Sequence, residues 1–242
     1  MIVGSISENL SQEQRVSVTP DIIKKYKSLG FEIHLSKNYG LHLGFTDQLY
    51  ENEGAKIFSS DDVISNSDAI LQLNILSDAG LGAAPGSFVA NQLIFNGGTL
   101  FNYNGASINF HANRGVTLTG DGTFKVNNSS TITVPGAITG SGALTVDVGS
   151  SGTLVLSGTN TYTGDTNINS GATLRVSGTL ADTTDVVNAG TYDVDANDTV
   201  RSISGSGGII DIADGVTLTD DSRANKTYAG VVAGSGTLSK AG

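Results

Sequence analysis

Short strand-like segments recur through the second two-thirds of the chain, and this repetition limits the folds that the sequence can adopt. GVTLTGDGT at 115–123 returns as GVTLTDDSR at 215–223, and VPGAITGSGALTV at 134–146 returns as YAGVVAGSGTLSK at 228–240. RSISGSGGIIDI is a third copy of the second pattern. Short strands cannot bury a face alone, but similar units bury it by stacking. The pattern therefore predicts a β-solenoid.

The densest unit, SSGTLVLSGTNTYTGDTNINSGATLRVSG, shows how one coil would be built. Alternation with period 2 places Leu154 and Leu156 on one face of a strand, and Thr153, Val155 and Ser157 on the other. Gly and Asn at the corners supply the positive φ that tight turns need. With roughly 20–25 residues per coil, the segment 85–242 would form about seven coils.

Composition changes near residue 80. Glu is absent from residues 81–242, which hold 23 Thr and 26 Gly, whereas residues 1–80 hold 2 Thr and 6 Gly. Glu favours helices, Thr fits pleated sheet and Gly favours turns. The small residues of AGLGAAPGS then predict a flexible junction. We expect an α/β domain at 1–78, a linker at 79–90 and solenoid repeats at 91–242.

Residues 1–78 alternate between strand and helix patterns, which predicts a parallel sheet with helices packed on it. MIVGSI, FEIHLS, AKIFS and DAILQLN are typical of strands, and SDDVISNS of a helical turn. FTDQLYENEG predicts a helix with Thr46 as N-cap and Gly54 as its end.

TPDIIKKYKSLG predicts the clearest helix of the chain. Thr19 is placed as its N-cap, Pro20 at its first position and Gly30 just past its end. The apolar spacing predicts one buried face, formed by Ile22, Ile23, Tyr26 and Leu29.

A resemblance to a known family covers this first segment. MIVGSISEN, QEQRVSVTPDIIKKYKSLGFEIHL, GFTDQLYENEGAKI and SDAILQLN resemble, in order and spacing, the amino-terminal domain of the alanine dehydrogenase and nicotinamide-nucleotide transhydrogenase family. The dehydrogenases carry a substrate-binding Lys at the position of Asn74, so LQLN is more similar to the transhydrogenase α subunit. Arg15 matches the family's R-V-x-x-T-P signature, in which Arg holds the substrate carboxylate. Because the Lys is missing, we expect Arg15 to be a surface residue before the helix, with substrate binding as the weaker alternative.

The cofactor chemistry of that family needs a glycine-rich loop at a helix N-terminus, which cradles the dinucleotide pyrophosphate. The sequence contains no G-x-G-x-x-G between a strand and a helix pattern. GSG at 140, 205 and 234, and GLGAAPG at 80–86, lie among strand or loop residues. We therefore expect no cofactor and no hydride transfer.

The densest repeat carries a second resemblance. Residues 152–174 resemble the autotransporter-associated β-strand repeat, which reads G-x-G-x-L, then L-x-L-S-G-x-N-x-Y-x-G, then T-x-I/V-x-x-G-x-L. The resemblance implies a right-handed parallel β-helix from a large bacterial surface or secreted passenger. The matching residues, which we expect to be structural, are Gly152, Leu154, Leu156, Ser157, Gly158, Asn160, Tyr162, Gly164, Thr166, Ile168, Gly171 and Leu174.

Candidate reactive groups are sparse. His34, His42 and His111 are isolated, and the sequence has no G-x-S-x-G, so we expect structural histidines and no catalytic residues. DVDAND at 193–198 lacks the Gly and terminal Glu of a helix-flanked calcium loop. We expect a solvated turn there, with weak calcium binding as the alternative, and no metal site. Asp147 and Asp165 are also expected in turns.

Charge and hydropathy limit the classes of partner that we expect for this chain. A net charge of −10 with scattered Lys and Arg argues against nucleic acid. No apolar run reaches 18 residues, so we expect no membrane insertion by this chain. The first residues lack a signal peptide's basic and apolar regions. The solenoid resemblance implies the cell surface and the first resemblance the cytoplasm, so the compartment stays open. GTLSKAG stops within a unit, which predicts self-association through an uncapped edge.

Two classes of function follow from a chain that combines two incomplete portions. The favoured one is a non-enzymatic structural or surface β-solenoid, with an adhesin module as one form and an unnamed glycan or protein as its partner. The alternative is a transhydrogenase-like oxidoreductase fragment, inactive for lack of the dinucleotide-binding domain. Saturable NAD(H) binding would distinguish the alternative from the favoured class.

Overall fold

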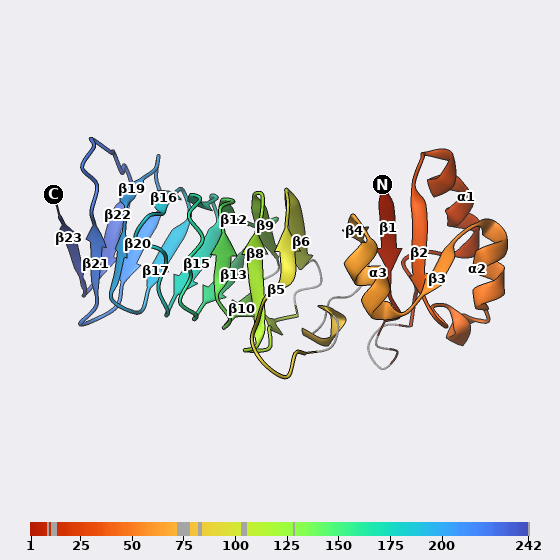
Figure 1. Ribbon diagram of the computed structural model, residues 1–242. Coiled ribbons are helices and arrows are strands. Elements are labelled where there is room, and N and C mark those ends of the chain that lie inside the picture. The colour runs from red at the N-terminus through yellow and green to blue at the C-terminus, as the bar shows by residue number, and fades with distance from the viewer. Residues whose placement is uncertain are drawn as a thin grey trace. The chain divides into compact units, whose positions relative to one another are not determined.

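The computed structural model describes residues 1–8, 10, 14–71, 78–81, 84–102, 106–127 and 129–241. The chain divides into two compact units, Met1–Ala83 and Ala84–Gly242. The first unit contains helices and strands, and the second consists of stacked strands (Figure 1). In the described part of the chain, no helix has the length and apolar character needed to cross a membrane.

A four-stranded sheet with the order β3-β2-β1-β4 forms the centre of the first unit, and its strand pairs are all parallel. This arrangement confirms the predicted α/β sheet, because parallel neighbours are joined by helical crossovers. The elements are β1 (Ile2–Ser5), α1 (Pro20–Ser28), β2 (Glu32–Ser36), α2 (Asp47–Glu53), β3 (Lys56–Phe58), α3 (Ser60–Asn66) and β4 (Ala69–Ile70), with short 3-10 helices at Leu41–Leu43 and Asp78–Leu81.

The ends of α1 and α2 follow the sequence signals. In α2, the Thr46 side chain accepts a hydrogen bond from the Leu49 N–H at 3.4 Å, and Gly54 ends the helix with a φ of 97°. In α1, Thr19 has the extended backbone of an N-cap, although its side chain makes no capping hydrogen bond. Gly30 follows α1 with a φ of 85°. Glycine suits both stops because it adopts positive φ without a Cβ clash.

The predicted buried face of α1 is partly wrong. Ile23 is fully buried and Tyr26 packs against the same core, as expected. Ile22 is exposed because it lies next to Ile23 in sequence, about 100° further around the helix. Leu29 is also exposed, because the helix ends at Ser28. The helix therefore contacts the core through a narrower stripe than the apolar pattern suggested.

The second unit is a parallel β-solenoid, as the repeats predicted. One face is a seven-stranded sheet, β22-β20-β17-β15-β13-β10-β7, and another is a six-stranded sheet, β19-β16-β14-β12-β9-β6. A third face holds two three-stranded sheets, β11-β8-β5 and β18-β21-β23. The stack has about nine turns, more than the seven coils that the repeat length predicted, because the seven-stranded sheet does not include every turn. The right-handed winding implied by the resemblance stays a prediction.

The strands of this unit are short and lie side by side along the stack (Figure 1). Their bounds are β5 (Val89–Phe95), β6 (Gly98–Asn102), β7 (Ile108–Asn109), β8 (Arg114–Leu118), β9 (Gly122–Val126), β10 (Ser130–Val134), β11 (Ile138–Gly140), β12 (Leu144–Asp147), β13 (Gly152–Leu156), β14 (Thr166–Ile168), β15 (Ala172–Val176), β16 (Asp185–Asn188), β17 (Thr191–Val194), β18 (Asp198–Val200), β19 (Ser202–Ser204), β20 (Ile209–Ile212), β21 (Thr217–Asp220), β22 (Val231–Gly234) and β23 (Thr237–Lys240).

The solenoid core consists of columns of side chains at equivalent positions. Leu154 pairs in register with Ile132 of the coil before and Leu174 of the coil after. These three side chains are fully buried, whereas Ser157 is exposed. Burying one such aliphatic side chain stabilises the fold by about 1.5–3 kcal/mol. The predicted inward and outward faces of the repeat are confirmed.

Glycine permits close approach of neighbouring coils at one corner. A Cβ on Gly142 would overlap the carbonyl oxygen of Gly120, and a Cβ on Gly164 would overlap that of Gly142. The GSG runs behave as predicted: Gly140 ends β11 and Gly234 ends β22, both with positive φ, so they lie at strand ends. These glycines shape corners of a stack and do not precede helices.

Candidate functional site

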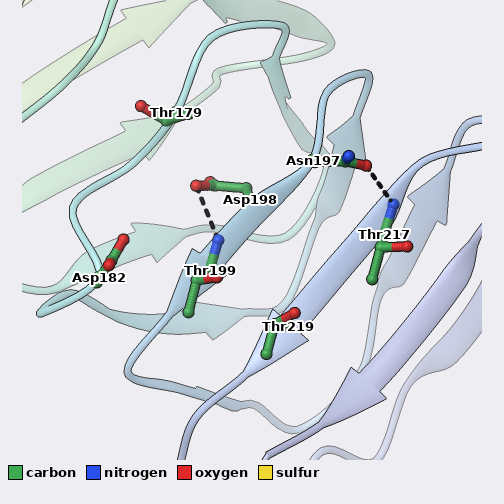
Figure 2. Close-up of a pocket in the computed structure, with 7 residues that line it drawn as sticks. All are labelled: Thr179, Asp182, Asn197, Asp198, Thr199, Thr217 and Thr219. Carbon is green, nitrogen blue, oxygen red and sulfur yellow. Dashed lines mark hydrogen bonds between the residues drawn. The ribbon is translucent and has the colours of Figure 1, made fainter.

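An open cleft of about 430 Å³ lies on the third face of the solenoid (Figure 2). It occurs where that face is interrupted. Between β11 and β18, the only described strand pairing on this face is an isolated bridge from Thr159 to Thr179. Residues 177–184 therefore cross the face as a loop. The cleft is lined by Thr179, Asp182, Asn197, Asp198, Thr199, Thr217 and Thr219.

All seven lining side chains carry an oxygen atom capable of hydrogen bonding, and none of the seven is basic or aromatic. Thr199 on β18 pairs in register with Thr219 on β21, so their side chains lie in one row. The Asn197 side-chain oxygen accepts a hydrogen bond from the Thr217 N–H at 2.8 Å, which ties the two coils together. The cleft is thus a polar surface with an acidic character.

Asp198 is the most buried charged group of the cleft, with 6% of its surface exposed. One carboxylate oxygen accepts a hydrogen bond from the Leu180 N–H, and the other accepts one from its neighbour Thr199, both at 3.0 Å. Burial raises the pKa of Asp198 to about 6, against the effect of these two bonds, and the nearby Asp182 raises it further. At neutral pH the cleft therefore contains a charged but poorly solvated carboxylate.

Two fully buried tyrosines lie on the interior side of Asp198. The Tyr162 hydroxyl is 2.6 Å from Thr166 Oγ1, and Thr166 is in turn 3.1 Å from Thr184 Oγ1. The Tyr192 hydroxyl has no hydrogen-bond partner among the described residues. Burial raises the pKa of both phenols, and the charge of Asp198 adds to this rise. Neither phenol supplies positive charge to the cleft.

Asn160 occupies the position equivalent to Asp198 two coils earlier. Its side-chain oxygen accepts a hydrogen bond from the Ile138 N–H of the preceding coil at 3.0 Å, as Asp198 accepts from Leu180. The Asn160 amide nitrogen also donates to the Thr179 carbonyl at 2.8 Å. Both side chains thus bond a backbone N–H of the coil before, which is a local role that a neutral amide performs as well.

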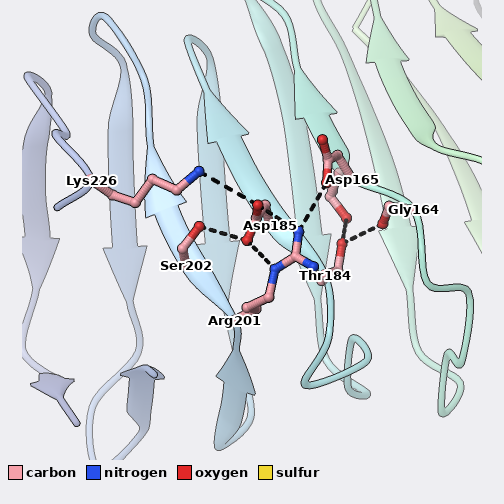
Figure 3. A network of polar contacts seen from close by, with 8 residues as sticks. Gly164, Asp165, Thr184, Asp185, Arg201, Ser202 and Lys226 are labelled. Atoms are coloured by element: carbon pink, nitrogen blue, oxygen red, sulfur yellow. Dashed lines mark hydrogen bonds and ion pairs between the residues drawn. The ribbon is translucent and has the colours of Figure 1, made fainter. Parts of the chain in front are cut away.

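A second polar cluster lies on the six-stranded face, and its charges neutralise one another (Figure 3). Arg201 donates two hydrogen bonds to Asp185, at 2.7 and 2.6 Å, and Ser202 donates another at 2.7 Å. Lys226 and Asp165 extend the cluster through ion pairs of 3.6 Å. The Arg201 guanidinium lowers the pKa of Asp185 to about 2. The contacts of this cluster link neighbouring coils.

The structure separates the residues that the sequence singled out. Arg15 is exposed and precedes α1 in the first unit, whereas every cleft residue belongs to the second unit. Asn74, which distinguished the two branches of the resembling family, lies outside the described residues. The repeat residues Asn160, Tyr162 and Thr166 are buried inside the coil. Arg15, which the sequence suggested for substrate binding, is not among the residues that line the cleft.

The histidines do not form a common site. His34 is buried with Nε2 2.6 Å from Glu32, His42 contacts the Gln14 carbonyl at 2.7 Å, and His111 Nδ1 accepts from the Asn113 N–H at 3.2 Å. Within the described residues, no group of three His, Asp or Glu side chains is placed to hold a metal ion.

Two predictions about acidic residues need correction. Asp147 ends β12, where it is 3.1 Å from Lys125 of β9, so it belongs to a strand pair and not to a turn. Asp198 is buried, whereas DVDAND was expected to be a solvated turn. The signal for Asp198 was present in the sequence. In the Asp198–Val200 strand, period 2 places Asp198 on the same face as Val200, which is fully buried.

Comparison with known proteins finds a different relative for each unit. Residues 4–117 match the family model "Alanine dehydrogenase/PNT, N-terminal domain", and residues 149–176 match "Passenger-associated-transport-repeat". The first match continues past the α/β unit into the first coils of the solenoid. Both resemblances inferred from the sequence are thereby confirmed.

Two curated relatives agree with these models. Alanine dehydrogenase 1 of Staphylococcus aureus (strain bovine RF122 / ET3-1) is 36% identical over 61 residues, which is 25% of this chain and 16% of that protein. Adhesin BmaC autotransporter of Brucella suis biovar 1 (strain 1330) is 32% identical over 209 residues, which is 75% of this chain and 6% of that protein. The chain spans only a small part of either relative. It therefore contains an autotransporter adhesin-like solenoid region and an alanine dehydrogenase/PNT-type amino-terminal domain.

Proposed function

We propose that the chain is a non-enzymatic surface module whose solenoid presents its outer faces for adhesion. The observation that carries this proposal is the register of the parallel stack. Leu154, Leu174 and their equivalents fill the interior, while Thr153 and Thr173 form an outward row. Such a stack offers an extended polar surface, and extended surfaces of this kind serve binding in solenoid proteins. The similarity to an adhesin supports the same assignment.

The charge distribution fits a binding surface better than a catalytic centre. Arg175 is 2.6 Å from Asp193, and Arg201 is 2.6 Å from Asp185, so these basic groups are already paired. A nucleophile is activated by an adjacent base within hydrogen-bond distance or by a lowered pKa. Asp198 is instead held by two backbone N–H groups. We therefore propose recognition, without bond making, as the role of the outer faces.

The test is attachment of the intact chain to surfaces of known composition. Full-length protein would be applied to immobilised glycans and matrix proteins, and bound protein would be measured as a function of concentration. We expect saturable binding to at least one surface, which a soluble form of the same molecule inhibits. Heat-unfolded protein is the matched control. Equal retention of folded and unfolded chain, or no retention on any surface, would contradict the proposal.

The alternative, a transhydrogenase-like fragment, is favoured by the match of residues 4–117. In this reading the first unit keeps a family fold, and Arg15 keeps the position of a substrate-binding residue. The discriminating measurement is a titration of the intact chain with NAD(H). Saturable binding at micromolar concentration, weakened by a change in the first unit, would support the alternative over adhesion as the primary function.

A further inference from the structure

One of the two backbone hydrogen bonds that Asp198 accepts, the one from the Leu180 N–H, does not require a carboxylate. The same backbone-binding role is performed by a neutral amide at Asn160, which accepts from Ile138 at the distance at which Asp198 accepts from Leu180. A buried amide with its hydrogen bonds made carries no cost of charge desolvation, whereas a buried carboxylate does. The raised pKa of Asp198 reports that cost. The second oxygen of Asp198 accepts from the Thr199 N–H, which an amide nitrogen cannot do, so the carboxylate completes a local hydrogen bond while its charge stays poorly solvated.

The cleft lacks the positive charge that a buried carboxylate ordinarily has beside it. Asp198 makes no ion pair in the described part of the chain, and Asp182 adds a second negative charge to the same cleft. Three other acids of the solenoid are paired: Asp147 with Lys125, Asp185 with Arg201 and Asp193 with Arg175. An external cation would compensate the two unpaired charges.

The remaining lining selects the kind of cation. Four threonine hydroxyls and the Asn197 amide surround the two carboxylates, so a ligand with hydroxyl groups finds both donors and acceptors. A volume of about 430 Å³ accommodates a sugar-sized ligand, because small-molecule sites span about 300–1,000 Å³. Only two acidic side chains line the cleft, and no three metal-binding side chains gather in the described residues. These features favour an ammonium group over a metal ion.

We propose that the cleft between the 177–184 loop, β18 and β21 binds an amino sugar, whose ammonium group contacts Asp198 and Asp182 and whose hydroxyl groups contact the threonines and Asn197. The assignment rests on the proposed adhesive function, for which it names a glycan class. An ammonium beside Asp198 stabilises the ionised carboxyl, so affinity falls as pH falls through about 6. The other groups that face Asp198 are Asp182, Tyr162 and Tyr192, and none of them is positively charged.

The experiment is a titration of the intact chain with a glucosamine trimer, followed by calorimetry and by amide chemical shifts. We expect saturable binding at pH 7, with shifts concentrated at residues 179–184, 197–199 and 217–219. The fully N-acetylated trimer keeps the hydroxyl groups but lacks the charge, and should bind at least tenfold more weakly. Lowering the pH from 7 to 5 should weaken binding of the free amine and leave the acetylated trimer unaffected.

Asp198→Asn is the central variant, because Asn160 shows that an amide fits the equivalent position. We expect it to bind the trimer at least tenfold more weakly, and its melting temperature is measured alongside, because the new amide nitrogen cannot accept the Thr199 N–H. Asp182→Asn should weaken binding less, and it provides an independent variant should Asp198→Asn unfold. Asp211→Asn removes an exposed acid on β20 and should leave affinity unchanged.

Equal affinity for the free and acetylated trimers would overturn the proposal. So would unchanged affinity in a folded Asp198→Asn protein, or chemical-shift changes that map away from the cleft. Binding of calcium ions in preference to the trimer would overturn the choice of ammonium. Adhesion of the intact chain to glycans without binding of the trimer would reject this assignment and leave the adhesive function standing.

Discussion

The two units bury their apolar residues in different ways. In the first unit, one cluster gathers side chains from strands, helices and loops, among them Ile23 of α1, Ile33 of β2 and Tyr50 of α2. In the second unit, one column repeats the same position, as in Ile132, Leu154 and Leu174 of successive coils. The cluster of the first unit depends on many different contacts made at the same time. The column of the solenoid repeats one kind of contact from coil to coil.

This difference sets the range over which damage spreads. Removal of one side chain from a shared cluster affects every element that contributes to it, so a small domain responds as one cooperative unit. In a stack, each coil contacts mainly its neighbours, and stability is approximately a sum of local terms. The comparison therefore predicts global responses in the first unit and graded, local responses in the second.

Limited proteolysis gives the largest expected effect and tests whether the units are independent. The small residues of AGLGAAPGS predict cleavage near residues 76–90, which would leave two protease-resistant pieces. Mass spectrometry of the fragments measures the cleavage positions. One protected core that runs through this junction would show that the two units unfold as a single cooperative unit.

Truncation of one core side chain in each unit tests whether damage spreads locally or through the whole unit. Leu154→Ala and Ile23→Ala each remove a fully buried side chain, and each should reduce the free energy of unfolding by about 2–5 kcal/mol. By hydrogen exchange, Leu154→Ala should increase opening around residues 130–180, and Ile23→Ala should increase it across the whole first unit. Thr153→Ala is the control, with a change within about 0.5 kcal/mol. Equal effects of Leu154→Ala and Thr153→Ala would refute the register of the repeat.

Acid titration separates two carboxylates of the solenoid whose pKa values shift in opposite directions. Asp198 has a folded-state pKa of about 6, above its ordinary 3.8, so the folded state gains stability as pH falls from above 6 towards 4. Asp185 has a folded-state pKa of about 2, so its contribution is complete above pH 4 and is lost as pH falls towards 2.

Asp198→Asn should therefore flatten the stability curve between pH 6 and 4, by at most about 3 kcal/mol. Asp185→Asn should flatten it between pH 4 and 2, by less than about 1 kcal/mol, because Arg201 is half exposed and the pair is screened by solvent. Chemical denaturation at a series of pH values measures both. Because the two carboxylates titrate in separate windows, a single variant that flattened both windows would contradict the assignment.

The two buried tyrosines provide the smallest and most closely matched test. Tyr162→Phe removes a hydroxyl bonded to Thr166 and should cost about 0.5–1.5 kcal/mol. Tyr192→Phe removes a hydroxyl without a described partner, so it should be neutral or slightly stabilising. Thermal melting of the two variants, side by side, checks the sign. A larger loss for Tyr192→Phe would reveal a partner that the structure does not show.

The sequence predicted burial correctly where a pattern repeats, and incorrectly where a single tertiary contact determines whether a side chain is exposed. Period 2 placed Leu154 and Leu156 inside the coil, and the capping signals placed Gly30 and Gly54 after their helices. The exposure of Leu29 depends on where α1 ends against its neighbours, which no local pattern specifies.

The candidate cleft was harder to predict than the fold. It forms because the third face loses regular pairing between β11 and β18, and because Asp198 accepts from Leu180 in the coil before. Both conditions join residues of successive coils. The sequence does show that Asp198 and Val200 lie on the same face of a strand. The loop beside Asp198, the cleft volume and the shifted pKa of Asp198 depend on three-dimensional packing.

The glycine corner has a genetic consequence. Gly142 abuts Gly120, and Gly164 abuts Gly142, so these two contacts leave no room for a side chain. Partners in neighbouring coils are separated by 22 residues in one part of the stack and by 18 in another, and the chain returns to the same place in both cases. Duplication or deletion of a complete turn preserves every corner, whereas an indel of a few residues within a strand shifts all later pairings. Lineages of such genes should therefore change in length by whole repeats.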